Sequence, residues 1–450
     1  MGSGGAALLD TLFGTQVLAS VLGDRGRIQG MLDFEAALAE AEASLGVIPP
    51  DAALAIAAKC KAELFDPAEL AEAAARAGNP AIPLIKSLTE LVAAVDGEAA
   101  RYVHWGATSQ DVMDTGLVLQ LRAALEAIKR DLDRLAATLA GRARVHRVTP
   151  IVGRTWLQHA LPVTFGLKIA GWLDAVGRHQ ERMLALEPRL LVLQFGGAAG
   201  TLAALGDKGL DVADALAKKL QLGLPNMPWH SQRDRVVELG TVMGMLVGTL
   251  GKMARDVSLL MQTDVGEAAE PSGEGRGGSS TMPHKRNPVT SAAVLAAATE
   301  VPGLVATLIA AMVQEHERGL GGWHAEWTTL PRLVSVAAGA LWLTANMMEG
   351  LEVDPARMRA NLEATQGLIM AEAVTMALGS SLGRLAAHRK VEASCRKATE
   401  EGRHLKEVLA ADAEIMAKLG PAALERLFEP TNYIGVAGAF IDRVLASSRT

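Results

Sequence analysis

The stretch "DRVVELGTVMGMLVGTLGKMARDVSLLMQTDV", residues 234–265, predicts one long helix without an interrupting proline. Its apolar residues are not confined to one stripe but surround nearly the whole helix. Such a helix is either buried on every side or spans a membrane. The uncharged run between Glu238 and Lys252 is shorter than the roughly 20 residues that a bilayer requires. We therefore expect this segment to be a core helix of a thick helical bundle.

The segment "VTSAAVLAAATEVPGLVATLIAAMVQEH", residues 289–316, has the same apolar character, and Pro302 predicts a kink within it. Glu300 and Pro302 interrupt this segment, which again argues against a membrane span. The few long helices of one chain cannot surround both apolar segments completely. We therefore expect copies of the chain to associate through these helices into a homo-oligomer.

The rest of the chain also favours helix. Alanine and leucine dominate, aromatic residues make up only 4%, and no segment shows sustained strand alternation. Further long helices are expected at residues 26–50, 111–141, 162–186 and 331–351. Shorter helices, broken at "GNPAIP", fill residues 51–96, and a charge-rich set of short helices follows Thr365. The predicted fold class is therefore all-α, with a central long-helix bundle.

The composition limits the classes of function. Hydrophobic residues make up 50% of the chain and charged residues 21%, which is typical of a globular protein. The net charge of −6, without a basic tract, argues against nucleic acid as a partner. Cys60 and Cys395 are too few and too far apart for a disulfide framework or a zinc site. The N-terminus lacks the features of a signal peptide, so we expect a cytoplasmic protein without a membrane partner.

Three stretches carry polar residues that a helical bundle does not need. They are "RYVHWGATSQDVMDT" (101–115), "VGRTWLQHALPVTFG" (152–166) and "PSGEGRGGSSTMPHKRNP" (271–288). All three lie where a predicted long helix begins or ends. Each has an ordinary explanation when taken alone. Thr, Ser and Asp residues cap helices, single histidines are common in cores and on surfaces, and a glycine-rich stretch can be a flexible connector.

The glycine-rich stretch does not fit a P-loop. Gly273 and Gly278 have the spacing of P-loop glycines, but Ser279 stands where the lysine should follow, and no buried strand is predicted before them. The sequence contains no HExxH motif and no paired Cys–His spacing that would indicate a metal site. We therefore expect neither a metal nor another cofactor.

The same stretch suits chemistry on a carbon acid. Its glycines allow backbone N–H groups to point at an anion, Lys285 supplies positive charge and Asn287 supplies an amide. Such donors stabilise the alkoxide of a serine, so Ser279 could act as a base or an acid on carbon. The matching substrate has a C–H bond next to a carboxylate. Removal of that proton gives a doubly charged aci-carboxylate, which the donors can hold.

The motif "GSSTMPHKRNP" (278–288) resembles the signature of the fumarase/aspartase superfamily, which includes argininosuccinate and adenylosuccinate lyases. "HWGATSQDVMDT" and "GRTWLQHALP" are similar to the superfamily's other two active-site segments, so the resemblance covers essentially the whole chain. It implies an all-helical protomer of three domains, residues 1–110, 111–362 and 363–450. It also implies a homotetramer with a central helical bundle, in which each active site takes residues from three subunits.

The resemblance further implies roles for individual residues. Ser279 is expected to be the catalytic acid or base on a mobile loop, assisted by Lys285, which with Asn287 binds the substrate carboxylate. Additional carboxylate-binding residues are expected from other subunits, namely Thr108, Ser109, Thr155 and Gln158. The candidates for holding a third carboxylate are His104, His159, Arg233 and Arg235.

Two departures from the adenylosuccinate lyases argue against a nucleotide substrate. This chain has "RTWL" where those enzymes have "RTHG", so Trp156 replaces their general-acid histidine. In "HERGLGGWHAEW" (316–327), Trp323 and Trp327 stand in place of a serine and an arginine that help to hold the nucleotide. Phosphate recognition thus loses its cation.

"PWHSQRDRVVELG" (228–240) together with "WHAEW" (323–327) resembles the bacterial 3-carboxy-cis,cis-muconate cycloisomerases, lactonising enzymes of protocatechuate breakdown in the β-ketoadipate pathway. The replaced histidine is consistent with that reaction. The ring-closing nucleophile is a carboxylate that is already ionised at neutral pH, and in the reverse direction it leaves without help from an acid. Only the protonation of carbon then needs a catalyst, and Ser279 is the candidate.

Two alternatives stay open. The chain could be a fumarate-releasing lyase of the same fold, in which His159, three residues after Trp156, substitutes as the acid. It could also be a non-catalytic helical protein that retained the loop, as some lens crystallins did. The presence of Ser279, Lys285 and Asn287 together argues against this last interpretation.

Overall fold

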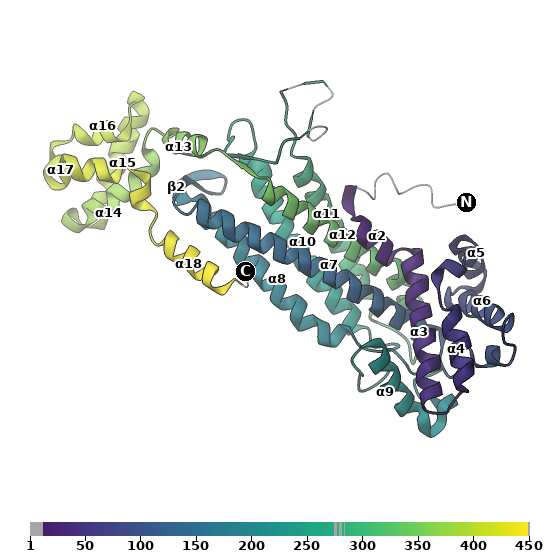
Figure 1. The fold of residues 1–450 in the computed structure, drawn as a ribbon. Helices are drawn as coiled ribbons and strands as arrows, with labels where there is room; N and C mark the ends of the chain where they lie inside the picture. The colour runs from purple at the N-terminus through teal and green to yellow at the C-terminus, as the bar shows by residue number, and fades with distance from the viewer. Residues whose placement is uncertain (1–11, 274–276, 279–280, 283, 449–450) are drawn as a thin grey trace. The chain divides into compact units, whose positions relative to one another are not determined.

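The computed structural model describes residues 12–273, 277–278, 281–282 and 284–448 of the chain (Figure 1). The described part is predominantly helical, which confirms the predicted all-α class. Ser279, the predicted acid or base, lies outside the described residues.

Two compact units make up the chain, and each is built from three stretches of sequence. The first unit comprises Met1–Leu132, Arg178–Gly251 and Ala293–Thr344, and the second comprises Asp133–Gly177, Lys252–Ala292 and Ala345–Thr450. The long helices of the chain contribute residues to both units. The division into three consecutive domains stays a prediction.

The long helices agree with the apolar segments of the sequence. They are α7 (Ser109–Val145), α8 (Phe165–Leu190), α10 (Asp234–Leu260), α11 (Val289–Ala311) and α12 (Gly322–Glu349). Pro302 lies inside α11, as expected. The start of α12 differs from the prediction, because Pro331 is accommodated in the helix interior although proline is more common in a first turn. The stretch "WHAEW" therefore lies in the first turns of α12.

Both α10 and α11 are long and apolar enough to cross a membrane by length and composition alone. A core helix meets the same criteria, and the most apolar window of α10 is 61% buried within the chain, as expected of a core helix. The corresponding window of α11 is only 22% buried. α11 therefore carries apolar surface that this one chain does not cover.

The first unit also holds a group of shorter helices. They are α2 (Gln16–Leu22), α3 (Asp24–Ser44), α4 (Pro50–Lys59), α5 (Pro67–Ala77), α6 (Ala81–Ala93) and α9 (Gly209–Leu220). α3 packs against α4 and α9, and it crosses α7 where Gly30 meets Gly116. A Cβ atom at Gly30 would lie 2.6 Å from the carbonyl oxygen of Gly116, so this close crossing requires glycine.

A β-hairpin in the second unit corrects the sequence prediction, which contained no strand. β1 (Pro150–Thr155) pairs antiparallel with β2 (Gln158–Thr164), and α8 consequently begins at Phe165 instead of Pro162. The strands lack regular apolar–polar alternation because the register shifts between Val152 and Arg154. A second pair, β3 (Ala268–Ala269) with β4 (Glu352–Val353), is only two residues long on each side. Strands this short leave no periodic signal in a sequence.

The C-terminal part of the second unit is the predicted set of short helices. They are α13 (Pro355–Glu363), α14 (Ala371–Leu382), α15 (Arg384–Glu401), α16 (Leu405–Ala410), α17 (Ala413–Leu427) and α18 (Ala437–Ser447). Val374, Val391, Leu405 and Ile415 belong to one buried apolar cluster that α14 to α17 share. Short 3-10 segments occur at Ala62–Leu64, Ala99–Tyr102, Ala203–Lys208, Leu368–Met370 and Pro430–Tyr433.

Candidate active site

The described site residues predicted from the sequence fall into two groups, one in each unit. The first unit contains His104, Thr108, Ser109, Arg233 and Arg235. The second unit contains Thr155, Gln158, His159, Lys285 and Asn287. Each group is described by itself below.

The segment that leads into α7 is fixed by the buried carboxylate of Asp111. This carboxylate accepts hydrogen bonds from the backbone N–H groups of Gly196 (3.0 Å), Gly197 (2.9 Å) and Thr108 (3.1 Å). It also lies 2.7 Å from Nε2 of His230. Four contacts to one carboxylate hold Thr108 and the residue after it, Ser109, in one geometry, as a substrate-binding segment requires.

Thr108 lies beside a cation that the sequence analysis did not single out. Its hydroxyl accepts a hydrogen bond of 3.2 Å from the guanidinium of Arg318, which also donates to the carbonyl of Ala198 at 3.1 Å. Among the described residues, the donor to the Thr108 hydroxyl is therefore the Arg318 guanidinium and not a backbone N–H group in the first turn of α7, as a helix-capping role for this hydroxyl would require. The available signal for Arg318 was its place in the "HERG" stretch (316–319), which lies between α11 and α12.

His104 forms a buried pair with Glu35 of α3. Its Nδ1 atom lies 2.6 Å from a carboxylate oxygen of Glu35, whose side chain is only 1% exposed. Burial alone would lower the pKa of His104, but the carboxylates of Glu35 and Asp111 outweigh that effect and raise it. His104 also adopts φ of 60°, an uncommon conformation for a residue with a side chain. Sequence patterns could not reveal Glu35, because it lies in a regular helix.

Arg233 is placed in the interior of the first unit, where two carboxylates engage its guanidinium. The residue is 1% exposed, and its side chain donates to both oxygens of Asp114, at 2.6 and 3.1 Å. Its Nε donates to Glu326 at 3.0 Å, and Trp323 Nε1 donates to Asp114 at 3.1 Å. In this arrangement Arg233 binds protein carboxylates and presents no free face to a ligand. Arg235, two residues on, donates to the backbone carbonyl of Arg189.

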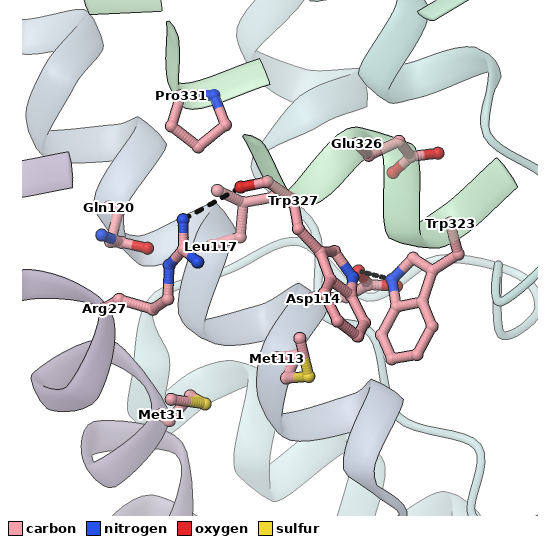
Figure 2. Close-up of a pocket in the computed structure, with 10 residues that line it drawn as sticks. All are labelled: Arg27, Met31, Met113, Asp114, Leu117, Gln120, Trp323, Glu326, Trp327 and Pro331. Atoms are coloured by element: carbon pink, nitrogen blue, oxygen red, sulfur yellow. Dashed lines mark hydrogen bonds between the residues drawn. The ribbon is translucent and has the colours of Figure 1, made fainter. Parts of the chain in front are cut away.

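Trp323 and Trp327 line a pocket next to this cluster (Figure 2). Their rings meet edge to face, with centroids 4.9 Å apart and an interplanar angle of 89°. Figure 2 shows Arg27 on the opposite side, where its guanidinium donates to the carbonyl of Trp327 at 3.0 Å. Trp323 and Trp327, which replace the serine and the arginine of the nucleotide-binding relatives, therefore form a packed aromatic wall of this pocket.

In the second unit the β1–β2 hairpin carries Thr155, Gln158 and His159, and all three are exposed. Trp156 at its tip is 97% exposed and, like Leu157, has a positive φ. Partial burial and the positive charge of Arg154 lower the pKa of His159, although Glu267 acts in the opposite direction. This lowered pKa favours the neutral form of the His159 imidazole.

The hairpin is anchored by a two-point ion pair. Arg154 of β1 donates to both oxygens of the buried Glu267, at 2.7 and 2.9 Å. Asn361 of α13 donates to the same carboxylate at 2.8 Å. Glu267 directly precedes β3, so the pair ties the hairpin to the strand that leads into the glycine-rich stretch.

Lys285 and Asn287 line an open pocket of about 860 Å³ in the second unit. Lys285 is exposed, and its backbone N–H donates to the carbonyl of Met282 at 3.0 Å. Asn287 is partly buried, and its backbone N–H donates to the carbonyl of Gly277 at 2.8 Å. The side-chain amine and amide that the sequence predicted for an anion site thus border one cavity. Over the described ranges, no group of three His, Cys, Asp or Glu side chains is placed to hold a metal ion.

Comparison with known proteins identifies the family. Residues 14–303 match the family model described as lyase, and residues 367–444 match adenylosuccinate lyase C-terminus. The chain is 60% identical to 3-carboxy-cis,cis-muconate cycloisomerase of Pseudomonas aeruginosa, over 98% of this chain and 96% of that protein. It is 57% identical to the cycloisomerase of the same name from Bradyrhizobium diazoefficiens, over 98% of both.

A solved structure agrees with these relatives. The crystal structure of 3-carboxy-cis,cis-muconate lactonizing enzyme from Pseudomonas putida superimposes with a TM-score of 0.94 at 55% identity, and 98% of each chain is covered. The sequence similarity and the shared all-helical fold therefore lead to the same assignment. The chain belongs to the lyase family of the fumarase/aspartase superfamily, as its three polar stretches predicted.

Proposed function

We propose that this protein is a 3-carboxy-cis,cis-muconate cycloisomerase, which closes 3-carboxy-cis,cis-muconate to 4-carboxymuconolactone in protocatechuate catabolism. The observation that carries the proposal is the 60% identity, along 98% of the chain, to a cycloisomerase of that name. The "SSTMPHKRNP" motif and the pocket at Lys285 and Asn287 supply the groups that this reaction needs.

In the proposed mechanism one carboxylate of the substrate adds to a double bond of the same molecule. The electrons move onto a neighbouring carboxylate, which becomes a doubly charged aci-carboxylate that Lys285 and Asn287 stabilise. Ser279 then donates its hydroxyl proton to the adjacent carbon, which completes the lactone, and the serine alkoxide regains a proton from solvent. No bond to the protein forms and nothing is oxidised or reduced, so the reaction needs no cofactor.

The hairpin fits a reaction without a general acid at the ring-closing oxygen. Trp156 occupies the place of the acid histidine of related lyases, and the neighbouring His159 is exposed, with a lowered pKa that favours its neutral form. A carboxylate nucleophile is ionised at neutral pH and gains little from a base. We therefore assign Thr155, Gln158 and His159 to substrate binding and not to proton transfer.

A tricarboxylate substrate requires several cationic or N–H donors. In the first unit these are His104, held beside Glu35, and Arg318, held beside Thr108. Nε of Arg318 is buried and has no hydrogen-bond partner among the described residues, so it has a donor to offer to a carboxylate. Arg233 is left out of the substrate-binding set in this proposal, because Asp114 and Glu326 already engage its guanidinium.

The assembly that we propose is a cytoplasmic homotetramer whose active sites are shared between subunits. The apolar surface of α11 that one chain leaves uncovered supports this arrangement. Trp156 and Leu157 also support it, because large apolar side chains at an exposed turn are expected to be covered by a partner. Symmetric association of like chains is the commonest way to cover such surfaces.

The test of the function is an ultraviolet assay with the purified protein. Incubation with 3-carboxy-cis,cis-muconate is expected to remove the absorbance of the conjugated diene as the lactone forms, without release of fumarate. If adenylosuccinate or another succinyl compound instead released fumarate while the muconate spectrum stayed unchanged, the lyase alternative would replace this proposal. No reaction with either would favour the non-catalytic alternative.

A further inference from the structure

The glycine-rich stretch has two arms, one that contains Ser272 and Gly277 and one that contains Arg286 and Asn287. Both arms contact the carboxylate of Glu352. On the first arm, Ser272 donates from its backbone N–H (2.9 Å) and from its hydroxyl (2.7 Å) to one oxygen of Glu352. On the second arm, Arg286 donates to the other oxygen at 2.8 Å. Ser272 is the second residue of the stretch (271–288) that contains Ser279, and Arg286 lies near its other end, between Lys285 and Asn287. One side chain thus connects both ends of the segment.

The short β3–β4 pair explains why Glu352 is at this place. Glu352 is the register partner of Ala269, so it lies directly beside the residue that precedes Glu270. The pair is extended by a hydrogen bond from the backbone N–H of Asp354 to the carbonyl of Glu267 (3.0 Å). Glu267 also holds Arg154 of the hairpin. The position of Glu352 is therefore set by backbone pairing and not by a flexible loop.

Arg286 makes a second contact that continues this framework. Its other terminal nitrogen donates to the backbone carbonyl of Glu270 at 2.7 Å. The Glu270 side chain is buried and accepts from the backbone N–H groups of Thr290 (2.9 Å) and Ser291 (2.7 Å) in the first turn of α11. Arg286 is therefore held between Glu352 and a residue that fixes the start of α11.

The arms also touch each other through the backbone. Asn287 N–H donates to the carbonyl of Gly277, and a Cβ atom at Gly277 would lie only 2.9 Å from the Asn287 carbonyl oxygen. Gly277 has φ of 68°, which glycine adopts without strain. The Arg286 contact with Glu352 is directly adjacent in sequence to this backbone contact, and Ser272 lies five residues before Gly277.

We propose that Glu352 is a positioning residue for the reaction, which places Lys285 and Asn287 by holding Ser272 and Arg286 together. The inference rests on the proposed function for the roles of Lys285 and Asn287. Glu352 lines the same pocket as Lys285 and Asn287. Among the described residues its carboxylate accepts hydrogen bonds from Ser272 and Arg286, and the proposed action of Glu352 is exerted through these two residues.

The charge state of Glu352 suits this role. The hydrogen bond from Arg286, followed by those from the Ser272 hydroxyl and backbone N–H, lowers the pKa of Glu352 to about 2. The carboxylate is therefore ionised at any pH at which the enzyme would work. Its side chain is 43% exposed and that of Arg286 is 46% exposed, so its removal is expected to change overall stability little.

A matched control exists elsewhere in the same unit. Glu429 binds Arg359 through two hydrogen bonds (2.8 and 2.9 Å) and accepts from the backbone N–H (3.2 Å) and hydroxyl (2.8 Å) of Thr431. Its pKa is also lowered to about 2, again chiefly by the arginine, and both side chains are 40% exposed. Glu429→Gln therefore removes the same kind of charge and contacts at a place that holds neither Ser272 nor Arg286.

The experiment compares Glu352→Gln with Glu429→Gln in the full-length protein. We expect Glu352→Gln to lower kcat for muconate consumption by about tenfold to a hundredfold, the range for displaced positioning groups, with a smaller change in KM. Glu429→Gln should keep the wild-type kcat, and both variants should unfold at similar denaturant concentrations. Hydrogen exchange should accelerate in peptides that contain Ser272 or residues 284–290 of Glu352→Gln, and it should not do so in Glu429→Gln.

The outcomes separate this inference from the proposed function. If the wild-type protein does not consume the muconate, the proposed function is wrong. The positioning role of Glu352 in that reaction is then wrong as well, even if hydrogen exchange shows that Glu352 holds the two arms in place. If the wild type is active and Glu352→Gln keeps its kcat, the positioning role is wrong whatever the exchange shows. Equal activity losses in both variants would also overturn it, because they would indicate a general effect of losing a surface ion pair.

Arg286→Lys is a further variant. Lysine keeps the positive charge, but it has one terminal nitrogen and cannot donate to Glu352 and Glu270 through separate nitrogens as arginine does. The kcat of Arg286→Lys is therefore expected to lie between those of the wild type and Glu352→Gln.

Discussion

The first unit and the second unit each contain an arginine held by acidic side chains, but the two clusters differ in burial. In the first unit Arg233 lies between Asp114 and Glu326, with side chains that are 0%, 3% and 2% exposed. In the second unit Arg286 and Glu352 are 46% and 43% exposed. Both clusters contain a guanidinium–carboxylate pair, but Arg233 binds two buried carboxylates, whereas Arg286 binds one exposed carboxylate and the backbone carbonyl of Glu270.

Because of this difference in burial, we expect the Arg233 cluster to contribute to stability and the Arg286–Glu352 pair to contribute to local geometry. In the first, Asp114 of α7 and Glu326 of α12 are joined through Arg233, which directly precedes α10. All three side chains are at most 3% exposed, so a partner that is removed leaves a buried charge unpaired. The cluster therefore acts on stability and holds the starts of three helices together. In the second, water can replace Glu352, so that its loss affects the geometry of two arms more than the free energy of unfolding.

The largest effect on stability is expected for Arg233→Met. This change leaves Asp114 and Glu326 buried without their cation, and breaking a buried pair in this way typically destabilises a protein by about 3–5 kcal/mol. The free energy of unfolding, or the denaturant midpoint if unfolding is irreversible, measures it. Arg359→Met is the exposed counterpart and is expected to lower stability by less than about 1 kcal/mol.

Equal losses in Arg233→Met and Arg359→Met would break the comparison between buried and exposed clusters. They would show that the interior around Arg233 admits water or relaxes around the two carboxylates. A loss of activity in Arg233→Met without a loss of stability would instead return Arg233 to the set of substrate-binding residues.

A smaller effect on stability, dependent on pH, is expected for Glu42→Gln. Glu42 adds a third case to the comparison, a buried carboxyl group without a cation beside it. Glu42 of α3 is buried, and neither of its carboxylate oxygens has a hydrogen-bond partner among the described residues. Burial, reinforced by the charge of Glu35, raises the pKa of Glu42 from 4.5 to about 8. The folded protein holds the Glu42 proton up to about pH 8, whereas the unfolded chain releases it above about pH 4.5. The contribution of the protonated carboxyl group to the free energy of unfolding is therefore fully present below pH 4.5 and is lost as the pH rises through about 8.

The expected result is that the free energy of unfolding of Glu42→Gln minus that of the wild type is larger at pH 8 than at pH 5. This increase follows from the shift in pKa and is on the order of 2–4 kcal/mol. Denaturant unfolding at the two pH values measures it, with the exposed Glu72→Gln as a control that should show no such change. A pH-independent difference between Glu42→Gln and wild type would mean that the carboxylate is hydrated in the folded protein.

The helices and the signature motif could be predicted from sequence, whereas the groups that we propose to position the site residues could not. Runs such as 234–265 identify their helix because burial on all sides leaves an apolar pattern in consecutive residues. Lys285 and Asn287 are recognisable because they are close together in a stretch of unusual composition. Glu35 and Glu352 give no such signal, since each looks like an ordinary charged residue and meets its partner far along the chain.

Arg233 shows the opposite failure. Its place in "HSQRDR", beside the predicted site segments, suggested a carboxylate-binding cation, and it does bind carboxylates, but they belong to the protein. One sequence cannot tell these cases apart, because both need an arginine near polar segments. The hairpin was missed for a different reason, since its register shift removes the alternation that identifies strands.

The most direct test of the central claim, that the "SSTMPHKRNP" motif performs the lactonisation, is the rate of muconate consumption by Ser279→Ala beside Ser280→Ala. Loss of an acid–base group on carbon typically lowers turnover by roughly 10²- to 10⁴-fold. We expect a loss in that range for Ser279→Ala with unchanged unfolding behaviour, and a distinctly smaller loss for Ser280→Ala. A Ser279→Ala enzyme that consumes 3-carboxy-cis,cis-muconate at close to the wild-type rate would contradict the account.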